Sequence, residues 1–139
     1  MKNALLIRNV LLKGENVDVR ITDGKFSCIS SAPLSPLPDE TLLDGSGFAL
    51  TPAFYNLHGH AAMSLMRGYA DDMELFKWLN EYVWPFEAKM TGEDIYNGTR
   101  LAILEMIKSG TVHFEDMYWF PFDAARAAKE MGIRARIGL

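Results

Sequence analysis

The chain has 139 residues, of which 49% are hydrophobic and 23% are charged, and its formal net charge is −4. This length and composition are typical of about one globular domain and exclude a disordered chain. The acidic balance, without a basic stripe, argues against nucleic acid or an anionic membrane as a partner. The only cysteine, Cys28, excludes an internal disulfide, so we expect a reducing, cytoplasmic location. The first apolar run is broken by Arg8 and is too short for a signal sequence or a membrane span.

The first part of the chain alternates short apolar runs with turn signals. Residues 4–12, 17–21 and 26–29 are compatible with β-strands, and Asp23-Gly24 is a strong hairpin signal between the last two. We expect these runs to form a small antiparallel meander. Residues 30–40 carry three prolines, which exclude a helix or a central strand there and predict a surface connection.

From residue 54 the pattern changes to strands that alternate with helices. We expect strands at 54–58, 111–116 and 133–137, and helices at 61–69, 73–83, 91–108 and 121–131. Pro85 is expected to end or restart the second of these helices. The order β, α, β, α, β predicts a parallel sheet with right-handed crossovers, and therefore an α/β fold.

Two of the three histidines, His58 and His60, stand two residues apart at the end of the first of these strands. Side chains two apart on a strand point to the same face, and functional groups of parallel α/β folds gather at the carboxyl ends of strands. Neutral imidazoles are good ligands for zinc and iron. The pair therefore indicates half of a metal site, and the alternative is two partly exposed loop histidines.

The residues around this pair carry a recognisable pattern. It comprises Pro-Ala-Phe-Tyr-Asn-Leu-His-Gly-His at 52–60, Met-Ser-Leu-Met-Arg-Gly at 63–68, Trp84-Pro85, Glu87, Ser109-Gly110-Thr111 and Asp116-Met117-Tyr118. This pattern resembles the start of the catalytic barrel in the amidohydrolase superfamily. Within it, the chain is most similar to methylthioadenosine/S-adenosylhomocysteine deaminases and related chlorohydrolases.

The resemblance implies a fold and a division of the chain. Residues 53–139 would form the first two to three βα units of a (β/α)8 TIM barrel, and residues 1–52 would form a small antiparallel β-sandwich segment before it. A complete barrel needs about 200 residues or more. We therefore expect this chain to be an N-terminal portion, and its catalytic residues to lie beyond residue 139.

The resemblance also implies a chemistry. His58 and His60 would bind one divalent ion, zinc or alternatively iron, which activates water for attack on the adenine ring of a 5′-substituted adenosine such as S-adenosylhomocysteine or methylthioadenosine. Glu87 would contact this purine nucleoside through its ribose hydroxyls. Apart from the resemblance, an aromatic face suits a base, so we expect Trp84, like Trp78, either to stack on the purine or, as is commoner for tryptophans at helical spacing, to pack in the core or a lid.

Several alternatives stay open. Guanine deamination and triazine dechlorination are rival reactions in the same superfamily, and a non-catalytic truncated module is the rival of another class. We expect the isolated chain to be inactive and to form homo-oligomers through exposed sheet edges. The pattern departs from its family at Gly59, where threonine is usual.

Three further side chains near the strand ends receive weaker interpretations. His113 lies inside the second strand and is expected to be a packed wall residue. Asp116 either points into the barrel mouth or caps a neighbouring amide. Arg136 shares one face of the last strand with Arg134, either on the substrate side or merely unburied.

Overall fold

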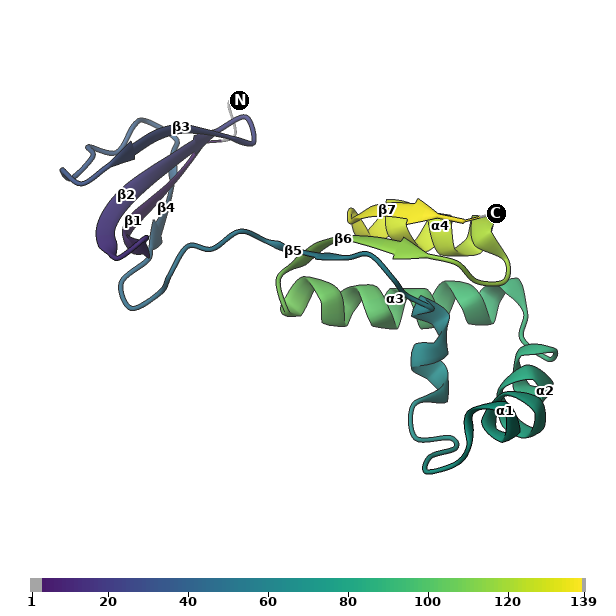
Figure 1. Cartoon of the computed structure of the whole chain (residues 1–139). Helices are drawn as coiled ribbons and strands as arrows, with labels where there is room; N and C mark the ends of the chain where they lie inside the picture. Colours follow the sequence, from purple (N-terminus) through teal and green to yellow (C-terminus); the bar gives the residue numbers. More distant parts are fainter. Residues whose placement is uncertain (1–3, 139) are drawn as a thin grey trace. The chain divides into compact units, whose positions relative to one another are not determined.

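The computed structural model describes residues 4–138, which divide into two compact units (Figure 1). The first unit comprises the described residues up to Pro52, and the second begins at Ala53. None of the helices in residues 4–138 combines the length and the apolar character that crossing a bilayer requires.

The first unit is a four-stranded sheet in the order β3-β2-β1-β4. Its strands are β1 (Ala4–Leu12), β2 (Glu15–Thr22), β3 (Lys25–Ser30) and β4 (Thr41–Asp44). β1, β2 and β3 form the expected antiparallel meander, but β4 pairs with β1 in parallel. The expectation of a wholly antiparallel segment was therefore wrong at β4. The proline-containing connection after β3 returns the chain to the end of the sheet where β1 begins, so β4 runs in the same direction as β1.

A bulge in β1 shapes this sheet. The register of β1 against β2 shifts between Ile7 and Val10, and Asn9 lies there with a φ of 55°. Asparagine tolerates this left-handed conformation better than most residues, because its short polar side chain forms local hydrogen bonds. The shift keeps Ile7 and Val10 in one buried cluster with Val17 and Val19.

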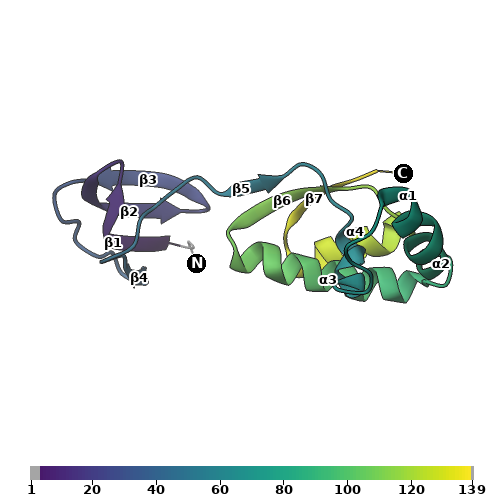
Figure 2. The ribbon, with the colours of Figure 1, turned by 60° about the horizontal axis from the view of Figure 1, so that its bottom comes forward.

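The second unit contains a three-stranded parallel sheet in the order β5-β6-β7. The strands are β5 (Phe54–Asn56), β6 (Thr111–Asp116) and β7 (Arg134–Ile137), and the crossover helices are α3 (Gly92–Lys108) and α4 (Pro121–Met131). The two helices lie side by side against one face of the sheet (Figures 1 and 2). The predicted β, α, β, α, β order and α/β class are confirmed.

Local signals explain the limits of the long helices. Thr91 and Asp94 form a capping box at the start of α3, and Gly132, with a φ of 75°, ends α4. β5 ends at Asn56, two residues earlier than expected. The Asn56 side chain accepts a hydrogen bond from the His58 amide at 3.3 Å, which turns the backbone away from the ladder.

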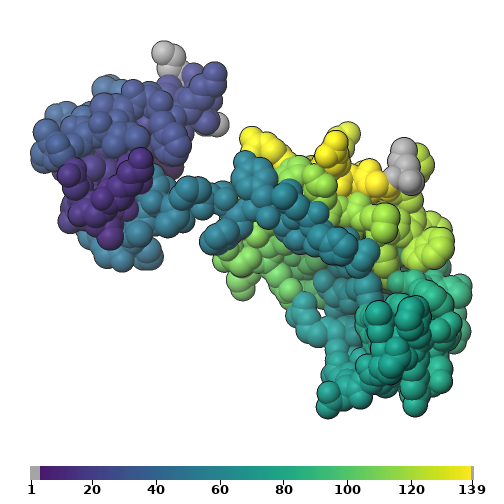
Figure 3. Space-filling model, in the orientation of Figure 1, coloured from purple at the N-terminus to yellow at the C-terminus, as the bar shows by residue number. Residues whose placement is uncertain are grey.

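The segment between β5 and α3 differs most from the expected helices. The first predicted helix is a 3-10 helix, η1 (Ala61–Met66). Further along the chain there is one continuous helical stretch, which consists of α1 (Leu75–Trp78), a π-helical turn η2 (Leu79–Val83) and α2 (Trp84–Glu87). Pro85 lies at the start of α2, directly after the π-helical turn, so the helical stretch changes type there and neither ends nor restarts. In Figure 3 these teal residues form a separate lobe of the second unit.

The core of the second unit holds β6 and η1 in place. Phe114 of β6 is completely buried against Ala102 and Ile103 of α3 and against Ala127 of α4. Gly98 of α3 packs so closely on η1 that an added Cβ would lie 2.7 Å from the Ala62 carbonyl oxygen. This contact fixes the residues that directly follow His60.

Candidate metal and substrate site

His58 and His60 lie just after β5, at the carboxyl edge of the parallel sheet. Their ring centroids are 5.2 Å apart and the two rings are nearly perpendicular, at 80°. His58 is exposed and His60 is half-buried. Gly59 between them approaches β6 closely, since an added Cβ would stand 3.2 Å from the Glu115 carbonyl oxygen. The sequence-predicted pair is therefore close in space.

The His60 ring is oriented by the backbone of the neighbouring strand end. Its Nδ1 lies 2.9 Å from the Met117 carbonyl oxygen. A carbonyl only accepts hydrogen bonds, so Nδ1 must carry the proton and donate. In the neutral ring this leaves the Nε2 lone pair free, and a backbone carbonyl on the other nitrogen is the usual support of a metal-binding histidine.

The two imidazoles are chemically suited to zinc or iron, and they form part of a metal coordination sphere. Two adjacent imidazoles, one of them oriented by a carbonyl, are suitable ligands for either ion. Within residues 4–138, no group of three or more histidine, cysteine, aspartate or glutamate side chains is arranged to hold a metal. These residues therefore offer a pair of imidazole ligands.

Asp116, at the end of β6, ties the two strand ends together. Its Oδ1 accepts a hydrogen bond from the Ala61 amide at 3.0 Å, so the capping interpretation of this carboxylate is correct. It also lines a hollow of about 310 Å³ that includes His58, His60 and Arg136. Burial, foremost, raises the pKa of Asp116, and its Oδ2 is buried without a partner among the described residues.

A second cavity, of about 470 Å³, brings together most of the predicted site residues. His60, Trp78, Trp84 and Glu87 all line it. The rest of its wall is mainly apolar or aromatic and comprises Met63, Leu79, Val83, Met117, Tyr118 and Trp119. An apolar cavity with a few polar groups is the usual form of a small-molecule site. His58 lines the first hollow, and His60 and Met117 are common to both cavities.

Two aromatic residues that the sequence analysis did not assign to the site bind Glu87. The Tyr118 hydroxyl donates to Glu87 Oε1 at 2.7 Å, and the Trp119 indole Nε1 donates to Glu87 Oε2 at 3.1 Å. Burial, and then the Glu87 carboxylate, raise the pKa of Tyr118, so its hydroxyl remains a donor. The signal that would have found both residues is their place at the end of β6, the rule already applied to His58.

The remaining candidates lie outside this cavity. His113 is half-buried on β6, with its ring centroid 5.6 Å from that of Tyr55 and its Nε2 4.0 Å from the Glu115 carboxylate. His113 lines none of the cavities that include His60. Arg136 is exposed on β7 and pairs with Glu115 at 3.4 Å.

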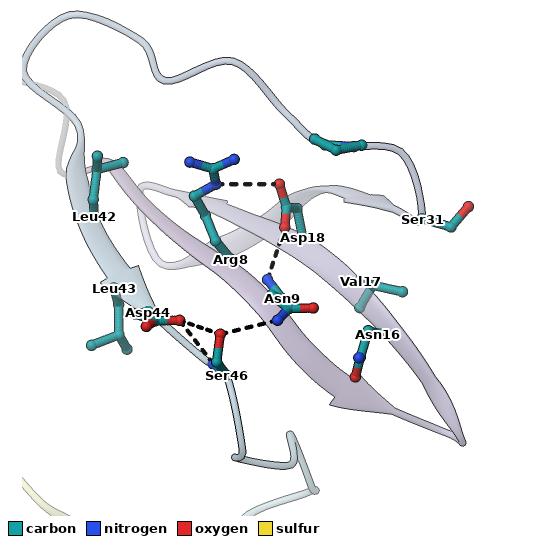
Figure 4. Close-up of a pocket in the computed structure, with 11 residues that line it drawn as sticks. Arg8, Asn9, Asn16, Val17, Asp18, Ser31, Leu42, Leu43, Asp44 and Ser46 are labelled. Carbon is teal, nitrogen blue, oxygen red and sulfur yellow. Dashed lines mark hydrogen bonds and ion pairs between the residues drawn. The ribbon is translucent and has the colours of Figure 1, made fainter.

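The first unit has a hollow of its own, around Asp18 (Figure 4). The Asp18 carboxylate accepts from the amides of Asn9 and Leu34 and lies 3.8 Å from the Arg8 guanidinium. The Asn9 side chain continues the network by donating to the Ser46 hydroxyl. These bonds join β1 and β2 to the loop segments beside them, so we interpret the network as structural.

Comparisons with known proteins agree with this geometry. The model of the amidohydrolase family matches residues 49–138. The chain belongs to the amidohydrolase family. It is 60% identical over 96 residues to a 5′-deoxyadenosine deaminase of Methanospirillum hungatei, a match that covers 69% of this chain and 21% of the relative.

Two further amidohydrolases match nearly the whole chain. One is a 5-methylthioadenosine/S-adenosylhomocysteine deaminase of Syntrophomonas wolfei, 46% identical over 134 residues, or 96% of this chain and 28% of the relative. The other is the crystal structure of an adenosine deaminase from Xanthomonas campestris with bound zinc, with a TM-score of 0.82 and 31% identity over 94% of this chain and 32% of that one. The chain spans less than a third of the length of these relatives.

Proposed function

We propose that these residues supply the first part of the active site of a metal-dependent deaminase. The enzyme would hydrolytically remove the amino group of a 5′-substituted adenosine such as S-adenosylhomocysteine, methylthioadenosine or 5′-deoxyadenosine. The observation that carries the proposal is that His60 and Glu87 line one aromatic cavity. The relatives named for these activities support the choice of substrate.

The histidine pair is the proposed metal-binding part. His58 and His60 would hold one divalent ion, zinc in the first place and iron as the alternative, and the zinc in the related adenosine deaminase supports this choice. When bound, the ion would activate water for hydrolysis. The chain's own contribution is to orient the imidazoles, through the bond from His60 to the Met117 carbonyl.

The cavity wall is the proposed nucleoside-binding part. A carboxylate has about four acceptor positions, and Tyr118 and Trp119 occupy one on each oxygen of Glu87. One position on each oxygen remains for a pair of ribose hydroxyls. Trp84 is 49% exposed, so its ring retains free surface on which a purine can stack.

We further propose the larger context of the two units. Residues 53–139 would be the first two to three βα units of a (β/α)8 barrel, and residues 1–52 would belong to a small β-sandwich segment. The parallel β5-β6-β7 sheet, with helices on one face, supports the barrel. Exposed apolar side chains on β5, Phe54 and Tyr55, support self-association, which a monomer in light scattering would contradict. The unpaired Cys28 suits the cytoplasm.

A deaminase assay tests the proposal. The protein to use continues from these residues to the full length of its relatives and is loaded with zinc. We expect ammonia release from methylthioadenosine, S-adenosylhomocysteine or 5′-deoxyadenosine, and loss of this release in His60→Asn. Turnover of guanine or of a chlorotriazine, without turnover of any adenosine, would replace the proposed substrate. No turnover of any of them would refute the proposal.

A further inference from the structure

We propose that Tyr118 and Trp119 are positioning residues that hold the Glu87 carboxylate in the orientation in which it receives the nucleoside. The inference rests on the proposed function, because it takes Glu87 as the substrate contact. It goes beyond the proposed function because it assigns a role to two residues that follow β6 and that contact Glu87, not the reacting atoms.

The geometry is that of a two-point clamp. The two donors come from consecutive residues and each binds a different oxygen of the carboxylate, at 2.7 Å for Tyr118 and 3.1 Å for Trp119. A glutamate held by one bond can still rotate about its terminal torsion. Donors on both oxygens fix the plane of the carboxylate, as a fork-shaped partner does.

The clamp also joins two parts of the chain that the sequence keeps apart. Glu87 ends α2, whereas Tyr118 and Trp119 follow the carboxyl end of β6. The preceding residue, Met117, accepts the bond from His60. The same short segment therefore orients a candidate metal ligand with its backbone and the candidate substrate contact with its side chains, which sets the position of one relative to the other.

A comparison within the chain supplies a control. Tyr96 on α3 also donates its hydroxyl to a glutamate, Glu130, but this pair does not line the cavity. Removing the hydroxyl of Tyr96 deletes the same type of hydrogen bond without touching Glu87. Tyr118→Phe and Tyr96→Phe are therefore matched variants.

The kinetic test uses the zinc-loaded protein carried to the full length of its relatives. Since the clamp serves ground-state and transition-state binding alike, its loss should raise KM and leave kcat nearly unchanged. We expect KM for the nucleoside to rise roughly tenfold in Tyr118→Phe and in Trp119→Phe, as for a lost hydrogen bond to a charged group. Tyr96→Phe should keep the KM of the wild type. An unchanged KM in both clamp variants, or an equal rise in Tyr96→Phe, would overturn the proposal.

A second measurement separates failure of the clamp from failure of the proposed function. In the 139-residue chain, the indole N–H resonance of Trp119 can be followed by NMR and assigned with Trp119→Phe. Glu87→Gln should move this resonance upfield more than those of Trp78 and Trp84, because its anionic acceptor is lost. An unmoved Trp119 resonance would overturn the clamp even in an active enzyme. Absence of deamination by the wild type, with the shift present, would refute the proposed function and leave the clamp geometry supported.

Discussion

Gly98→Ala should have two opposite effects on stability, because Gly98 of α3 packs closely on Ala62 of η1. In the interior of α3, alanine is favoured over glycine by about 1 kcal/mol of helix propensity. Its Cβ, however, would lie 2.7 Å from the Ala62 carbonyl oxygen and 3.0 Å from the Ala62 Cα. These are backbone atoms of η1 and cannot rotate away. Overpacking of this type costs about 1–3 kcal/mol, and we take a value near 3 kcal/mol because the obstacle is backbone. The expected net destabilisation is about 2 kcal/mol.

Urea unfolding followed by tryptophan fluorescence measures this effect, because all three tryptophans belong to the second unit. A loss of about 2 kcal/mol corresponds to a fall in Tm of about 10 °C for a unit of this size. Asn97→Ala is the control. Asn97 is exposed on the same helix, so alanine at this position raises the helix propensity without causing a clash. A Gly98→Ala protein as stable as the wild type, or more stable, would refute the close packing of α3 on η1.

Two further predictions concern the core and the first unit. Phe114 is completely buried whereas Phe122 is 80% exposed; Phe114→Ala should therefore cost about 3–5 kcal/mol and Phe122→Ala about 0.5 kcal/mol or less, and equal losses in urea unfolding would contradict the assigned core. The hydrogen bond from Arg20, foremost, holds the pKa of Glu40 below its usual range. The stability from this pair should be present above the usual glutamate pKa of about 4.3 and be lost as the pH falls through the lowered folded-state value. Unfolding followed by circular dichroism from pH 6 to pH 3 checks this, and an identical pH dependence in Glu40→Gln would contradict it.

The sequence predicted those parts of the fold that local patterns determine. Alternating apolar residues gave the meander of the first unit, and the change to helical spacing after His60 gave the βαβ order of the second. Thr91 and Gly132 marked helix ends because capping depends on neighbouring residues in the chain. The parallel pairing of β4 with β1 had no such signal, because a strand carries no local mark of its partner's direction.

The candidate site was predictable to a smaller extent. His58 and His60 were predicted as a pair because residues two apart at a strand end share a face, Glu87 was predicted from the resemblance, and Trp84 was predicted because an aromatic face suits a purine. The bonds from Tyr118 to Glu87 and from His60 to the Met117 carbonyl join residues 31 and 57 positions apart. These contacts depend on how the segment after β6 lies beside the end of β5 and beside α2, and the spacing of apolar residues in the sequence carries no information about that.

Zinc binding by the 139-residue chain tests the central claim, that His58 and His60 are its metal-binding pair, most directly. With two imidazole ligands we predict weak and substoichiometric zinc, removed by a chelator and abolished when both histidines are replaced by asparagine. His113→Asn is the control and should retain the wild-type zinc content. A full equivalent of zinc that resists the chelator, or zinc that persists without His58 and His60, would contradict the claim.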